Sequence, residues 1–79
     1  MIRLTEIQRN NGKIQCEAYV EDCDSAITLS LDEKTAELSE VELPKGYEWC
    51  KSHIAHARKF LRTLIGADQI PAQRVIMWY

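Results

Sequence analysis

The sequence has few of the features that identify catalysts or membrane proteins. Its three glycines are isolated, so no glycine-rich phosphate loop is present. No Gly-x-Ser-x-Gly motif occurs, and no apolar run approaches the roughly 20 residues that cross a bilayer. Residues 1–6 alternate instead of forming the apolar core of a signal peptide. We therefore expect a single small domain over residues 1–79, without a signal peptide, a membrane span or a cofactor.

Cysteine is present, but not in a pattern typical of crosslinking. Three is an odd number, and no Cys-x-x-Cys pair occurs, which disfavours a disulfide framework. The simplest expectation is reduced thiols that pack as small apolar residues. Reduced thiols predict a cytoplasmic protein, of the bacterial type that such a short chain suggests.

Charge of one sign is also lacking. The net charge of −2 disfavours a generic polyanion binder, because non-specific affinity for nucleic acid comes from accumulated phosphate neutralisation. The distribution is uneven, however. Residues 1–46 carry five basic and ten acidic side chains, whereas residues 47–79 carry five basic and two acidic ones. We therefore expect a bipolar surface with a basic helix.

Alternation of apolar and polar residues predicts the strands. They are expected from residue 2 onward, then at 14–20, 27–31, 36–43 and 74–79. The pair Asn11-Gly12 predicts a tight hairpin between the first two strands. Ile7 has the opposite parity to Ile2, so either a bulge intervenes or Ile7 faces outward. The glutamate-rich 36–43 segment, closed by Pro44, is typical of an edge strand.

The period changes to that of a helix over residues 47–65, ended by Gly66. Two starts are open: residues 47–49 form a loose first turn, or Ser52 caps a shorter helix. The predicted fold is therefore α+β: a mostly antiparallel, four- to five-stranded sheet (β-β-β-β-α-β) with one amphipathic helix packed on one face. The last strand pairs with the first or with the fourth, and we favour the first. The predicted core is Ile2, Leu4, Ile14, Cys16, Ala18, Val20, Ile27, Leu29, Leu31, Ile54, Ala57, Leu61, Leu64, Val75 and Met77.

The run Cys50-x-x-His53-x-x-His56 is the sharpest chemical pattern. Residues three apart on a helix are neighbours, so these side chains, with Cys16 from the sheet, are candidate zinc ligands. Cys50 and His53 are also a candidate thiol–base pair. The structural interpretation is favoured: Cys50 lies in the core, His53 lies at its margin and His56 is solvated. We predict no metal site and no catalytic residues.

Aromatic residues gather at the start of the helix and at the end of the chain. We expect these aromatics to be core residues at the two ends of the helix–sheet sandwich; the alternative is an interaction surface that they form with nearby basic residues. The candidate surface comprises Arg58, Lys59, Arg62, Trp49, Trp78 and Tyr79. Stacking aromatics beside cations are used by single-strand nucleic-acid binders, which keeps that function as an alternative. We favour a non-catalytic protein-interaction or accessory domain, with homodimerisation through the uncovered sheet face as a second expectation.

Overall fold

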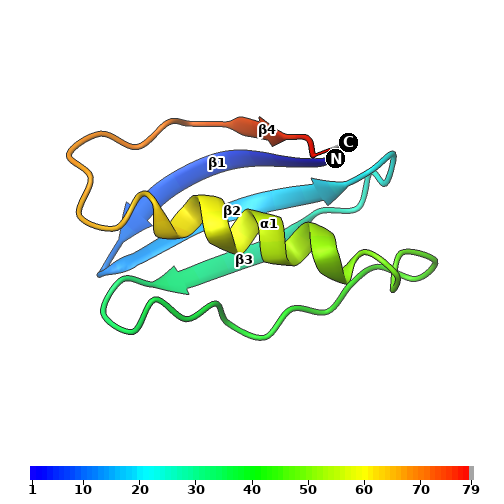
Figure 1. Cartoon of the computed structure of the whole chain (residues 1–79), viewed down its shortest axis with the longest axis horizontal. Helices are drawn as coiled ribbons and strands as arrows, with labels where there is room; N and C mark the ends of the chain where they lie inside the picture. The colour runs from blue at the N-terminus through cyan, green and yellow to red at the C-terminus, as the bar shows by residue number, and fades with distance from the viewer. Residues whose placement is uncertain (79) are drawn as a thin grey trace.

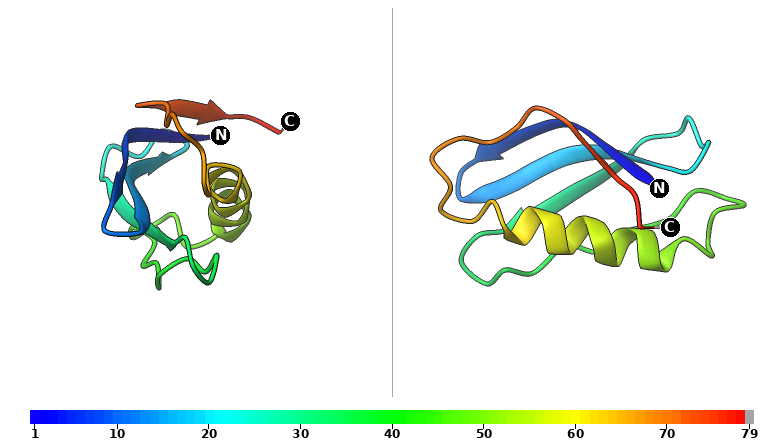
Figure 2. Two further views of the ribbon diagram at one scale, coloured as in Figure 1. Left: turned by 90° about the vertical axis from the view of Figure 1, so that its left-hand side faces the viewer. Right: turned by 45° about the horizontal axis from the view of Figure 1, so that its top comes forward.

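The computed structural model describes residues 1–78 and contains four strands and one helix (Figure 1). The elements are β1 (Ile2–Asn10), β2 (Lys13–Val20), β3 (Ile27–Asp32), α1 (Lys51–Arg62) and β4 (Arg74–Ile76). The strands form one antiparallel sheet in the order β3-β2-β1-β4. The helix covers one face of it (Figure 2). The predicted α+β fold is confirmed.

The hairpin of β1 and β2 forms the centre of the sheet. Asn11 and Gly12 both have positive φ, 53° and 77°, as a tight hairpin turn requires. Ile2 lies opposite Val20 and Leu4 opposite Ala18, so the apolar residues of both strands share the face beneath the helix. This face, with its counterparts on β3, is the core.

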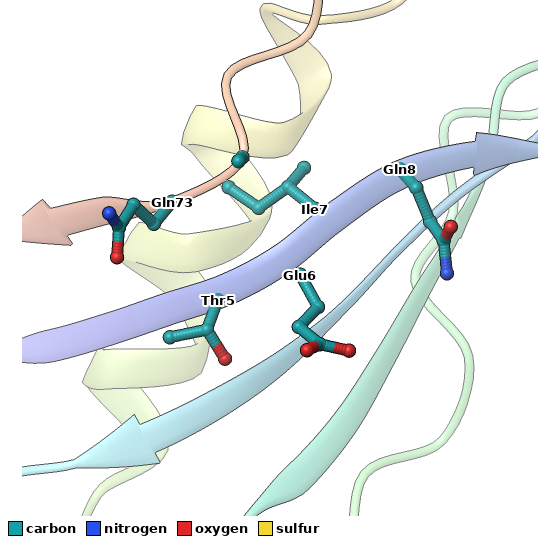
Figure 3. Close-up of a pocket in the computed structure, with 6 residues that line it drawn as sticks. Thr5, Glu6, Ile7, Gln8 and Gln73 are labelled. Atoms are coloured by element: carbon teal, nitrogen blue, oxygen red, sulfur yellow. The ribbon is translucent and has the colours of Figure 1, made fainter.

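A bulge in β1 explains the parity of Ile7. Glu6 has φ of 52°, and the pairing with β2 shifts between Thr5 and Gln8. The extra residue turns Ile7 back into the core, on the opposite side of the strand from Thr5 and Glu6 (Figure 3). Of the two alternatives left open by the sequence, the bulge is the one observed.

The strand expected at 36–43 is not formed. Ala36 has φ of 60°, which turns the chain after β3, and the only ladder contact in this segment is a bridge between Leu31 and Leu38. Leu38, Val41 and Leu43 still pack against the core from irregular backbone. The prediction of a strand was wrong because these apolar residues are buried without a regular period.

The helix is shorter than the sequence predicts. Residues 47–50 form turns, in which Cys50 donates its backbone N–H to the carbonyl of Tyr47, 3.0 Å away. The helix then runs from Lys51 to Arg62, and Gly66, with φ of 74°, ends the turns that follow. Its inward face carries Cys50, His53, Ala57, Leu61 and Leu64, whereas the predicted core residue Ile54 is half-buried.

β4 pairs antiparallel with β1, as favoured from the sequence, with Ile76 opposite Ile2 and Val75 opposite Arg3. This register turns Ile76 toward the helix and Val75 to the open face. Val75 and Met77 are 49% and 64% exposed, so their assignment to the core was wrong. The run from Val75 to Trp78 is apolar at every position, so only the register with β1 decides which residues face inward.

Candidate interaction surface at the start of the helix

Two tryptophans flank the buried imidazole of His53. Trp49, in the turn before α1, meets the ring of His53 edge-on with 5.5 Å between centroids. Trp78, beyond β4, does the same at 4.7 Å. The chain after β4 crosses toward the first half of the helix, which allows this contact (Figure 2). The turn before α1 and the segment after β4 therefore meet at the side chain of His53.

His53 is held in place by a carboxylate. Its Nε2 lies 2.8 Å from Oε2 of Glu21, the residue that follows β2, and the same oxygen accepts from the amino group of Met1. Since a carboxylate only accepts hydrogen bonds, Nε2 carries the proton in this arrangement. Nδ1 is buried and has no partner among residues 1–78. Glu21 thus satisfies one ring nitrogen of His53, whereas the other is buried without a partner in this part of the chain.

Sequence reasoning missed Glu21. Glu21 and His53 lie 32 positions apart, and no local sequence pattern connects them. The available signal was indirect: a histidine on the inward face of a helix needs a polar partner, and acids at the ends of the neighbouring strands are the natural candidates.

Trp49 is the most exposed ring of this group. It is 64% exposed, which corrects the expectation that the aromatics are core. Its indole N–H donates to the carbonyl of Gly46, 3.1 Å away, and its ring stacks near Tyr47 with 6.5 Å between centroids. Tyr47 in turn donates its hydroxyl to Asp22 over 2.7 Å. Trp49 is therefore held in a fixed orientation although it faces solvent.

His56 is not simply solvated, as predicted, but half-buried against Trp78. The two rings stack at 4.2 Å between centroids and 14° between planes. Lys59 is one turn further along the same flank of the helix and is exposed. We call Trp49, His56, Lys59 and Trp78 the aromatic flank.

Among the described residues of the predicted surface, Arg58 and Arg62 lie on a different helix flank from Lys59. Arg62 donates its Nε to the carbonyl of Ala36 over 3.0 Å, which places it on the helix flank beside the acidic 36–43 segment. Arg58, one turn before it, shares that flank and is exposed. Lys59, by contrast, lies one turn from His56, the residue that stacks on Trp78. Tyr79 lies outside the described residues.

The thiol candidates are buried rather than poised for chemistry. Burial raises the pKa of Cys16 to about 12, and burial with a smaller contribution from the charge of Glu21 raises the pKa of Cys50. A nucleophile needs the opposite shift. Among residues 1–78 no three His, Cys, Asp or Glu side chains lie close enough together to hold a metal ion, so the structure does not bring Cys16, Cys50, His53 and His56 into one ligand set.

The hollows found on the surface of the described residues are open to solvent. One, of about 490 Å³, lies over the β1 bulge and is lined by side chains that include Thr5, Gln8 and Gln73 (Figure 3). The lining also includes the carboxylate of Glu6, on the same side of β1 as the hydroxyl of Thr5 (Figure 3). The hollow is therefore an open surface depression lined mostly by polar residues.

Comparison with protein-family models, with curated proteins and with solved structures finds no match to any of them. Within the described part of the chain, the single helix is too short and too polar to cross a membrane. Since no comparison finds a match, the functional interpretation of the aromatic flank depends on its geometry alone.

Proposed function

We propose that this domain is a non-catalytic interaction module that binds a partner protein through the aromatic flank. The observation that carries the proposal is Trp49, an exposed tryptophan fixed by the carbonyl of Gly46 and by the ring of His53. Rigid tryptophans contribute disproportionately to protein interfaces, because they bury a large area and lose little conformational entropy on binding.

Charge favours an acidic partner segment. Helix α1 carries four basic side chains and no acidic one, and Lys59 is one turn along the helix from His56, which stacks on Trp78. Arg74 adds a further cation on this side of the molecule, where its guanidinium lies 5.2 Å from the ring centroid of Phe60. Opposite charge on the partner would orient it and increase the rate of association.

Nucleic-acid binding is the alternative supported by the same features. Aromatic rings beside cations suit stacked bases and phosphates. The cations are divided between two helix flanks, however, and the net charge is −2, which together favour a protein partner. A reducing, cytoplasmic compartment suits the three unpaired, buried thiols.

Site-specific photo-crosslinking tests the location of the partner. Benzoylphenylalanine at Ser52, an exposed position on the aromatic flank, should give discrete crosslinked proteins in the native cell. The same group at Thr28, exposed on the open face of the sheet, is the matched control and should give none. Equal crosslinking at both positions would contradict a specific surface.

A titration followed by NMR separates the two classes of ligand. We expect poly-L-glutamate at low salt to shift the indole N–H resonance of Trp49, and Trp49→Ala to weaken binding by about tenfold, or 1.4 kcal/mol, without unfolding the protein. A shift with oligo-dT and none with polyglutamate would favour nucleic acid. No shift with either, together with no crosslink from Ser52, would refute the proposal.

A further inference from the structure

The two edge strands of the sheet, β3 and β4, differ in how far other parts of the described chain pair with their backbone. Along β3, Ser39 donates its N–H to the carbonyl of Ser30 over 2.8 Å, and Asp32 donates to that of Glu37 over 2.9 Å. The exposed Glu37 and Glu40 add charge to this edge, which discourages further pairing. β4 forms the other edge, and within residues 1–78 no strand lies outside it.

The register shows which backbone groups of β4 face outward. Glu21 donates its N–H to the carbonyl of Met1, so Met1 directs its backbone toward β2. Alternation then directs Ile2 and Leu4 toward β4, where they meet Ile76 and Arg74. Val75, between those two, consequently directs both its N–H and its C=O away from the sheet.

Nothing in the described chain covers this edge. After Ile76 the backbone turns toward the helix, where Trp78 stacks on His56 (Figure 2). Val75 and Met77 remain 49% and 64% exposed on the open face. An open strand edge with exposed apolar side chains and no charge on its outer face is a template for another strand.

We propose that a second copy of this chain pairs with β4 through this edge. In the antiparallel arrangement, a two-fold axis passes beside Val75, and the two Val75 residues exchange both backbone hydrogen bonds. Arg74 then lies opposite Ile76 of the second copy and not opposite another Arg74. The sheet becomes eight-stranded, and both helices lie on the same face of it.

Self-pairing is favoured over capture of an unrelated peptide because the segment is self-complementary. Arg74 is the only charged residue of 73–77, and the two-fold register never places two like charges together. Away from β4 the open face is polar, with Gln15, Glu17 and Thr28, so it offers no apolar surface that extends across the sheet for the face-to-face dimer considered from the sequence. The edge is only three residues long, so we expect a weak, concentration-dependent dimer.

Sedimentation equilibrium of the full chain tests the proposal. We expect a monomer–dimer equilibrium between about 10 µM and about 1 mM. Val75→Lys and Val75→Glu each place like charges opposite one another, so each variant alone should be monomeric over this range. An equimolar mixture of the two should dimerise again, which shows that both are folded.

Thr28→Lys is the control, because Thr28 lies on the open face of β3 far along the sheet from β4. It should dimerise like the unmodified chain, and its failure to do so would indicate a face-to-face dimer and overturn the proposal. Hydrogen exchange gives a direct readout: the amide of Val75 should exchange rapidly when dilute and at least tenfold more slowly when concentrated. A monomer at every concentration, with Val75 exchange unchanged, would also overturn it.

Discussion

His53 joins two tryptophans, a carboxylate and the core at one side chain. Its ring is only 5% exposed, and its two edge-on contacts account for the positions of Trp49 and Trp78. Packing and hydrogen bonding therefore make separate contributions at this residue, and substitutions can separate them.

His53→Ala removes both contributions, so we expect it to lower the free energy of unfolding by about 2 kcal/mol. His53→Phe keeps a ring between the tryptophans and removes the unpartnered Nδ1, while Glu21 is exposed enough to meet water. We expect this variant to lose less than about 1 kcal/mol. Urea unfolding measures both. Equal losses would indicate that the hydrogen bond to Glu21, and not the packing, stabilises the site.

The buried thiols provide a second test at the residue scale. Since burial raises the pKa of both Cys16 and Cys50, neither forms an appreciable thiolate near pH 8 in the folded chain. We expect iodoacetamide to label them only as fast as the protein unfolds, with rates that rise along a urea series. Mass spectrometry of the labelled peptides identifies each site. Rapid labelling of Cys50 without urea would instead reopen the thiol-enzyme hypothesis.

The elements show where periodicity is informative. Alternation predicted β1, β2 and β3 because each has one face on the core and one toward solvent. It failed at 36–43, where Leu38, Val41 and Leu43 are partly buried without a sheet to set their spacing. It also could not orient β4, whose residues from Val75 onward are apolar on both faces. Contacts distant in sequence decide both cases.

The positive φ of Ala36 leads to a prediction at the element scale. Ala36→Gly removes the steric cost of this conformation and should raise the free energy of unfolding by about 0.5 kcal/mol. Ala55→Gly, at an exposed position inside α1, is the matched substitution and should lower it by about 1 kcal/mol. Thermal unfolding measures the two opposite signs. If both substitutions lowered the free energy of unfolding, the positive φ of Ala36 would not be a source of strain in the turn after β3.

At the scale of the whole molecule, one ion pair fastens the central hairpin to the end of the helix. Arg9 donates from Nε and Nη2 to the two carboxylate oxygens of Glu33, at 2.6 and 3.0 Å, and also donates to the carbonyls of Leu64 and Ala67. The N–H of Gly66 donates to Glu33 over 3.2 Å. Strands β1 and β3 are thereby connected to the chain that leaves α1. No local sequence pattern predicts these contacts, because the residues that form them lie up to 58 positions apart.

The hydrogen bond from Arg9, aided by the N–H of Gly66, holds the pKa of Glu33 below its usual value of 4.5. A depressed carboxyl pKa stabilises the fold above the unfolded-state pKa, and this stability is lost as the pH falls through the folded-state pKa. We therefore expect Glu33→Gln to unfold at lower urea than the parent at pH 7, by a modest margin because solvent screens the pair. The difference should shrink as the pH falls below 4.5 and vanish once the pH is below the depressed pKa of Glu33 in the folded chain. A difference that persists there would assign the effect to packing.

The position of β4 beside β1 also affects how the chain folds as it is made. Of the described elements, β1 is synthesised before all the others and β4 after them, yet the two strands are neighbours in the sheet. Until residue 76 is available, β1 exposes an unpaired edge, and the tryptophan that packs on His53 from that side is missing as well. The sheet can therefore be completed only after residue 76 has been synthesised, and earlier intermediates expose an unpaired strand edge that is prone to wrong pairing.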